Sequence, residues 1–173
     1  MDEKNKDLKI TITLPSTAYF VSGIRDFTLN LVKNTTEFSE QWAFRFQSVI
    51  DELCNNAIEY GSSPGSDVRI TYHLVDGEYL EITVEDTGTG KEKLTAEEIK
   101  KLYAERRAPG FVFAGIRGRG LAKIVGEWTD ELTFEDRPGG GLRISVKKYM
   151  KEPRQNSNSL KVEKPMEHIV LES

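Results

Sequence analysis

The sequence contains one cysteine, Cys54, so no disulfide bond can form within the chain, and we expect this residue to be a small core side chain. No apolar run approaches the roughly 20 residues that a membrane-spanning helix needs. Basic residues do not outnumber acidic ones, with 24 Lys and Arg against 28 Asp and Glu. The resulting net charge of −4 gives no electrostatic reason to expect nucleic acid or an anionic membrane as a partner.

The charged start of the chain, residues 1–9, is not followed by the apolar stretch of a signal peptide. The charged fraction of 30% and the hydrophobic fraction of 38% are typical of a soluble globular protein with a core. We therefore expect a cytoplasmic protein in which residues 1–150 form one domain. Residues 151–173 are polar, and we expect them to form a disordered tail.

Two periodicities divide the domain into strands and helices. Alternating apolar residues predict strands at residues 8–14, 67–75, 79–85, about 131–135 and 142–149. Apolar residues at helical spacing predict helices from 16 or 17 to about 34, at 40–60 and at 121–128, with a short helix after the Thr95 and Glu98 capping box. The segment 104–117 mixes arginine, proline and glycine, and it predicts a mobile loop.

Hairpin signals join the predicted strands in pairs. Asp76-Gly77 separates the second strand from the third, and a run of arginine, proline and three glycines at 137–141 separates the last two. Strands joined in hairpins, with helices between them, predict an α+β fold. We expect a two-layer α/β sandwich in which helices cover one face of a mixed, mainly antiparallel sheet.

Glu52 and Asn56 lie four residues apart in the predicted helix 40–60. Residues with this spacing share one face of a helix, so the two side chains project into the same space. A carboxylate beside an amide oxygen suits a hard cation, or a cation held next to a base. An ordinary solvated helix face is the alternative interpretation of the same pattern.

Asp86, Gly88 and Gly90 form a second candidate site directly after the predicted strand 79–85. Glycines at these positions let the backbone approach a flat ligand closely. They also suit a simple turn, because acidic residues and glycines are common where strands end.

Gly118 and Gly120 belong to a glycine-rich loop that leads into the predicted helix 121–128. Backbone amides at the start of a helix bind phosphate when no side chain obstructs them, and Arg117 and Arg119 could add charge-assisted hydrogen bonds. The loop is not a Walker A motif, since no Gly-Lys-Ser/Thr follows, and not a Rossmann fingerprint, since no strand immediately precedes it. The alternative is a flexible turn with solvated arginines.

Taken in chain order, these three groups of residues (the Glu52 pair, the Asp86 run and the glycine-rich loop) resemble the N, G1 and G2 boxes of the GHKL superfamily of ATPases and kinases. The resemblance covers about residues 8–150. The run Gly-Arg-Gly-Leu-Ala-Lys-Ile-Val at 118–125, with Trp-Thr-Asp at 128–130, is similar to the pattern of the bacterial anti-sigma-factor serine kinases. The resemblance implies a Bergerat-type ATP-binding fold, with ATP and Mg²⁺ as cofactors.

The resemblance also implies roles for single residues. Glu52 would be the general base that deprotonates the attacking hydroxyl or water. Asn56 would hold Mg²⁺ against the phosphates, with its neighbour Asn55 as a lesser candidate. Asp86 would accept a hydrogen bond from the adenine amino group.

Gly88 and Gly90 would shape the adenine pocket, and about residues 91–117 would form a lid that closes over ATP. Backbone amides would bind the phosphates, and these implied donors are Gly118, Arg119, Gly120 and Leu121.

The function that the resemblance implies is that of an ATP- and Mg²⁺-dependent serine/threonine protein kinase. Such a kinase phosphorylates a small α/β anti-anti-sigma partner and, in alternation, sequesters a sigma factor or an analogous regulator. A homodimer is also implied, although the sequence shows no periodic interface.

Two other functions stay open for this sequence. One is an ATP-binding partner-switch module without phosphotransfer, against which Glu52 counts because binding alone needs no base. The other is a stand-alone histidine-kinase-like ATPase domain. The short lid and the lack of a linker helix before Leu8 lead us to expect that this second alternative is wrong.

Overall fold

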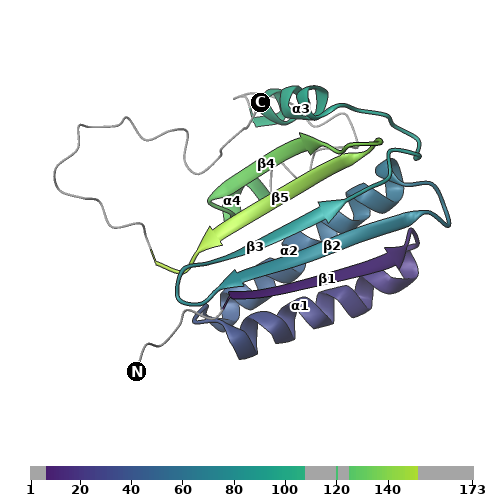
Figure 1. Ribbon diagram of the computed structural model, residues 1–173. Helices are drawn as coiled ribbons and strands as arrows, with labels where there is room; N and C mark the ends of the chain where they lie inside the picture. Colours follow the sequence, from purple (N-terminus) through teal and green to yellow (C-terminus); the bar gives the residue numbers. More distant parts are fainter. Residues whose placement is uncertain (1–6, 108–119, 121–124, 152–173) are drawn as a thin grey trace, which may run out of the picture.

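The computed structural model describes residues 7–107, 120 and 125–151, which form a two-layer α+β fold (Figure 1). Five strands make one sheet in the order β1-β2-β3-β5-β4. Their bounds are β1 Asp7–Pro15, β2 Asp67–Val75, β3 Tyr79–Glu85, β4 Glu131–Asp136 and β5 Leu142–Tyr149. Neighbouring strands are antiparallel in every pair, so the described sheet is antiparallel throughout rather than mixed.

Helices cover one face of this sheet, as the sequence predicts, and Figure 1 shows α1 and α2 on the same side of the strands. The helix α2 continues directly into a π-helical turn, η2, and α3 lies beside β4. The helical bounds are η1 Ala18–Phe20, α1 Val21–Thr35, α2 Glu40–Asn56, η2 Ala57–Gly61, α3 Ala96–Arg107 and α4 Gly126–Trp128.

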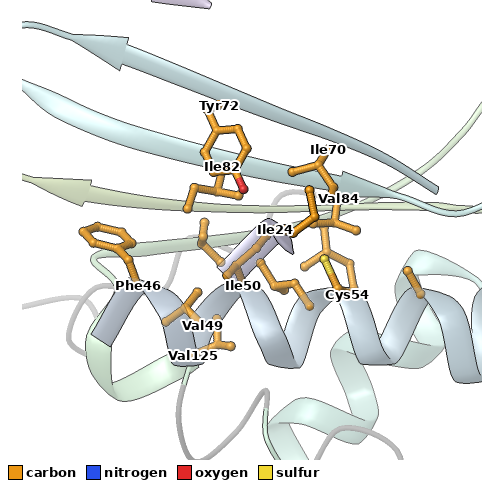
Figure 2. Close-up of a cluster of buried hydrophobic side chains, with 14 of the residues drawn as sticks. Ile24, Phe46, Val49, Ile50, Cys54, Ile70, Tyr72, Ile82, Val84 and Val125 are labelled. Carbon is orange, nitrogen blue, oxygen red and sulfur yellow. The ribbon is translucent and has the colours of Figure 1, made fainter. Parts of the chain in front are cut away.

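Alternation along the strands places apolar side chains between the sheet and the helices. In β2, Val68, Ile70, Tyr72 and Leu74 are at most 4% exposed, and the residues between them face the opposite side of the sheet. Figure 2 shows Ile70 and Tyr72 directed toward α2, where Ile50 is fully buried. This layer is the hydrophobic core of the fold.

The apolar stripe predicted for α2 and its continuation is confirmed as a core surface, with Phe46, Val49, Ile50, Leu53 and Ala57 buried. Cys54 is buried as well, and burial raises the pKa of its thiol to about 12, which agrees with a packing role. Ser39 caps the start of α2, since its hydroxyl accepts a hydrogen bond from the Trp42 N–H at 3.4 Å.

The capping box predicted for α3 is confirmed. The Thr95 N–H donates to the Glu98 carboxylate at 2.7 Å, and the Glu98 N–H donates to the Thr95 hydroxyl at 3.2 Å. The helix includes residues 104–107, so the loop predicted to begin there is wrong at its start. Tertiary packing explains the difference, because Tyr103 is 2% exposed and its ring centroid lies 5.9 Å from that of Phe134 in β4.

Within the described ranges, no helix is both long enough and apolar enough to span a bilayer. Three predicted segments lie outside the described residues: the loop at 108–117, the helical residues 121–124 and the tail from 152 onward.

Candidate functional site

The end of α2 carries the first group of candidate residues. Glu52 and Asn56 lie one turn apart on the same face. Glu52 is half-buried, and only 4% of Asn56 is exposed, so the alternative of an ordinary solvated face does not hold for Asn56. Asn55 is half-buried, and its side chain leaves the helix about 100° away from that of Asn56.

The Asn56 side chain is buried without hydrogen bonds to the described part of the chain. Neither its amide oxygen nor its amide nitrogen has a partner there. Leaving a buried polar group unpaired costs roughly 1–3 kcal/mol, so such groups in native proteins call for an explanation. A ligand, an ion or water could supply the missing partners, and Asn56 therefore has the character of a binding residue.

Glu52 lies against Gly120, the described glycine of the glycine-rich loop. A Cβ atom added at Gly120 would overlap the Glu52 carboxylate. Burial raises the pKa of Glu52, and the negative charges of Asp51 and Glu59 raise it further. The carboxylate is thus held next to the loop backbone and made a better proton acceptor than an exposed glutamate.

Asp86 follows the last residue of β3 and is 4% exposed. Its Oδ1 accepts hydrogen bonds from the N–H groups of Gly88 at 2.9 Å and Leu142 at 3.1 Å. The Asp86 N–H in turn donates to the Leu142 carbonyl at 3.0 Å, and the Arg137 guanidinium donates to the Asp86 carbonyl. These contacts fix the orientation of the carboxylate.

The glycines around Asp86 allow three backbone segments to approach closely. A Cβ atom at Gly61 would overlap the Asp86 carboxylate, and one at Gly90 would overlap the Tyr60 carbonyl oxygen. A Cβ atom at Gly141 would overlap the Asp86 carbonyl oxygen. The end of η2, the loop after β3 and the β4–β5 hairpin therefore fit together only with glycine at these positions.

Gly88 is required for its conformation as well as for space. Its φ angle is +69°, in the left-handed region that favours glycine. An added Cβ atom would also lie 2.5 Å from the backbone nitrogen of Gly141. The loop after β3 is thus packed against the hairpin, which a solvent-exposed turn would not require.

A cleft of about 260 Å³ opens beside this loop, and its lining includes Asp86, Gly88, Leu94, Arg137 and Gly141. A larger hollow of about 450 Å³ lies on the open face of the sheet and is lined by charged and hydroxyl side chains. We place the candidate site at the end of β3 and α2, because the fixed carboxylate and the close-packed glycines gather there.

Two arginines of the β4–β5 hairpin, Arg137 and Arg143, contact the carboxylate of Glu85 at the end of β3. The sequence pattern did not single out these three residues. Glu85 is 6% exposed and accepts hydrogen bonds from Nε of Arg143 at 3.1 Å and from its Nη2 at 3.0 Å. Nε of Arg137 lies 3.4 Å from the same carboxylate. Hydrogen bonds to Glu85 and Glu135 raise the pKa of Arg143. The available signal was the run of three glycines at 139–141, which is longer than a tight hairpin needs.

Hydroxyl side chains connect the loop after β3 to the loop after η2, and the sequence pattern gave no sign of this. The Ser62 hydroxyl accepts a hydrogen bond from the Thr87 N–H at 3.0 Å. The hydroxyl oxygens of Ser63 and Thr89 lie 2.9 Å apart. Thr87 and Thr89 are the variable positions of the Asp-x-Gly-x-Gly run, so these side chains stabilise the loop that presents Asp86.

Three predicted phosphate-binding residues, Gly118, Arg119 and Leu121, lie outside the described residues, as does the lid beyond residue 107. The part of the predicted lid that is described includes α3, which packs on β4. In the described part of the chain, no group of three or more His, Cys, Asp or Glu residues could hold a metal ion.

Comparisons with known proteins found one family and two curated relatives that match this chain. The family described as "Histidine kinase-, DNA gyrase B-, and HSP90-like ATPase" matches residues 43–152, a range that contains every candidate residue above. The sensor histidine kinase RcsC of Escherichia coli (strain K12) is 30% identical over 110 residues, which cover 60% of this chain and 11% of RcsC. RcsC of Escherichia coli matches to the same extent. The chain thus spans about a tenth of the length of these curated relatives.

Substitutions at Gly61, which lies against Asp86, and at Gly23, which has open space around it, should change the stability of the fold in opposite directions. Gly61→Ala should lower the free energy of unfolding by about 1–3 kcal/mol, because the new methyl group meets the Asp86 carboxylate. Gly23→Ala in α1 is the matched control, since an added Cβ atom there meets nothing within 4 Å. It should raise stability by roughly 0.5–1 kcal/mol. Urea unfolding measures both, and two stabilising changes would contradict the packing at Gly61.

Because the pKa of Glu52 is raised, we expect the Glu52→Gln substitution to increase the stability of the fold in a pH-dependent way. Because folding raises this pKa, the Glu52 contribution to stability is complete below the pKa of the unfolded state, about 4.3, and is lost as the pH rises through the folded value. Glutamine carries no charge, so the variant should be more stable than the wild type at pH 7, with no such gain near pH 4. Urea unfolding at a series of pH values measures this difference.

Glu40→Gln in the same helix is the control, because the pKa of Glu40 is shifted in the opposite direction. A hydrogen bond from Lys33 lowers the pKa of Glu40, so its stabilising effect is present at pH 7 and lost as the pH falls. Glu40→Gln should therefore reduce stability at pH 7. A gain from Glu52→Gln that is equally large at both pH values would show that the burial of its charge is not the cause.

Proposed function

The chain belongs to the histidine kinase-, DNA gyrase B- and HSP90-like ATPase family, and from this premise we propose that it is an ATP- and Mg²⁺-dependent serine/threonine protein kinase of the anti-sigma-factor type. In this proposal it phosphorylates a small α/β anti-anti-sigma partner and sequesters a sigma factor or an analogous regulator. One observation carries the proposal: the Glu52 carboxylate lies against Gly120, one helical turn from the buried Asn56.

The described residues fit ATP and Mg²⁺. Asn56 offers a buried amide oxygen without a partner among the described residues, and Mg²⁺ binds oxygen ligands. Gly120 carries no side chain that could obstruct its backbone amide, which suits the binding of phosphate by that amide. When bound, Mg²⁺ would neutralise negative charge that develops during transfer.

Glu52 would act as the base on the attacking hydroxyl group. Its carboxylate accepts the hydroxyl proton as the serine oxygen bonds to the γ-phosphorus and the bond to the β-phosphate oxygen breaks, which releases ADP. Its raised pKa supports this role, because a general base is most effective when its pKa lies near the working pH. A module that only binds ATP needs no carboxylate at this position.

Asp86 would select adenine over guanine. The N–H groups of Gly88 and Leu142 hold its Oδ1, so the carboxylate keeps one orientation. A carboxylate can accept a hydrogen bond from the amino group of adenine. Guanine presents a carbonyl oxygen at the corresponding position, and two facing acceptors repel each other.

The serine acceptor and the sigma-factor partner rest on the resemblance of residues 118–130 to the anti-sigma-factor kinases. A second candidate function is that of a histidine-kinase-like ATPase domain, and the similarity to the sensor histidine kinase RcsC favours it. Incubation with labelled ATP and candidate partners distinguishes the two. Phosphoserine survives acid and is lost in alkali, whereas phosphohistidine is lost in acid.

Substitutions at Glu52 and Asn56 should separate chemistry from binding. Glu52→Gln keeps the shape of the side chain but cannot take the proton, so turnover should fall by roughly 10²–10⁴-fold while Mg·ATP affinity changes little. Asn56→Ala removes the buried amide oxygen, so affinity and turnover should fall together. Calorimetry measures the affinity, and single-turnover phosphotransfer measures the rate.

Glu40→Gln, at the exposed start of the same helix, is the control and should change neither quantity. Full phosphotransfer by Glu52→Gln would remove the base from the mechanism. Tight binding of ATP by the wild type, without transfer to any serine-bearing partner, would instead support the partner switch.

A further inference from the structure

The N-terminal half of α2 carries an arginine, Arg45, that has no acidic partner in the described part of the chain. Its guanidinium lies 4.5 Å from the ring centroid of Trp42 and 5.6 Å from that of Trp128, at the end of α4. Lys148, which also lies over Trp42, is by contrast paired with Asp130 at 3.0 Å. A stacked guanidinium keeps the N–H groups at its edge available, so Arg45 can bind a carboxylate of another molecule.

Arg45 lies on the same stripe of α2 as the Glu52 carboxylate. Seven residues make almost two helical turns, so the two side chains project in similar directions from points about 10 Å apart along the helix. Asn56 belongs to this stripe as well, one turn beyond Glu52. Arg45 and Asn56 therefore lie on opposite sides of Glu52 along the helix.

The candidate nucleotide site lies on the C-terminal side of Glu52. Asn56 follows Glu52 in α2, and Asp86 lies against Gly61 at the end of η2. In phosphoryl transfer the attacking and leaving oxygens are roughly in line with the phosphorus. With the leaving group on the C-terminal side, the attacking hydroxyl approaches Glu52 from the N-terminal side, where Arg45 lies.

An exposed aromatic side chain lies next to Arg45 in the sequence. Phe44 is 51% exposed, and it is the one large hydrophobic side chain of α2 that is exposed. Aromatic residues and arginine are enriched at protein–protein interfaces, where they contribute much of the binding free energy. Phe44 and Arg45 together therefore have the character of a docking surface for another protein.

We propose that Phe44 and Arg45 bind the phosphoacceptor protein, with a carboxylate of the acceptor on Arg45 and an apolar side chain on Phe44. This inference rests on the proposed kinase function, because it takes Glu52 as the base that faces the acceptor serine. An extended segment rises about 3.3 Å per residue, so an acidic residue about three positions from the serine reaches Arg45. Arg45 is then a residue that determines which serine is phosphorylated.

The charges around Glu52 set the opposite preference directly beside the serine. Asp51 and Glu59 place further negative charge near the Glu52 carboxylate. An acidic residue next to the serine is therefore repelled, whereas the same residue is attracted when it lies at Arg45. The distance between the acidic residue and the serine thus distinguishes a good acceptor from a poor one.

Labelled serine peptides that differ only in the order of their residues test this preference on the full chain. In two peptides an aspartate and a leucine lie three positions before or after the serine, and in a third they lie directly beside it. Fluorescence anisotropy with saturating Mg·ADP measures binding, and transfer from ATP measures kcat/KM. One of the first two peptides should bind about 10-fold more tightly than the third, as expected for a hydrogen bond between charged groups.

Arg45→Gln should remove most of this preference. It should raise KM for the peptide and leave kcat and the Mg·ATP affinity nearly unchanged, because the contact is the same before and during transfer. Phe44→Ala should weaken binding of the same peptide by roughly two- to fivefold. Lys9→Gln is the matched control, since it removes an exposed positive charge on the open face of the sheet, and it should have no effect.

Charge reversal separates a lost contact from a damaged fold. Arg45→Glu should bind the aspartate peptides poorly and prefer peptides in which lysine replaces the aspartate, a gain that misfolding cannot produce. Equal binding of the three peptides by the wild type, binding of none, or a preference that Arg45→Gln retains would overturn the proposal, even if the peptides are phosphorylated. A preference that depends on Arg45, without transfer to any serine, would support the docking surface and contradict the kinase function.

Discussion

The contact between the end of the α2–η2 helix and the end of β3 is the constraint on which the candidate site depends. Gly61 lies against the Asp86 carboxylate so closely that no side chain fits between them. Because α2 and η2 form one continuous helix, this contact also sets the positions of Asn56 and Glu52. The helix widens into a π turn between Asn56 and Gly61, a distortion that is frequent at functional sites.

Two consecutive carboxylates at the end of β3 are buried, and they are stabilised in different ways. Side chains alternate across a strand, so Glu85 and Asp86 face different surroundings. The guanidinium groups of Arg137 and Arg143 neutralise Glu85, whereas the backbone amides of Gly88 and Leu142 hold Asp86. Glu85 thus belongs to an ion-pair network with the two arginines, whereas the backbone contacts of Asp86 fix its orientation at the end of the strand.

Local patterns were sufficient to predict the strands, the apolar stripe of α2 and the capping box of α3, because each depends on residues close in sequence. They could not show that Asn56 is buried, since that depends on how the helix end meets distant parts of the chain. The extension of α3 through residues 104–107 was missed because Tyr103 packs against Phe134 of a later strand. Arg137 was missed for the same reason, because its hydrogen bond to the Asp86 carbonyl joins two segments that are far apart in sequence.

Calorimetric titration of the Asp86→Asn variant with Mg·ATP and Mg·GTP tests the central claim, that this carboxylate reads the base of a bound nucleotide. Asparagine can keep the acceptor that binds the N–H groups of Gly88 and Leu142, and it replaces the other carboxylate oxygen by a donor. The account predicts that the wild type prefers ATP to GTP by roughly 100-fold or more, and that the variant loses this preference because ATP binds more weakly. Equal affinities of the wild type for the two nucleotides, or an unchanged preference in the variant, would contradict it.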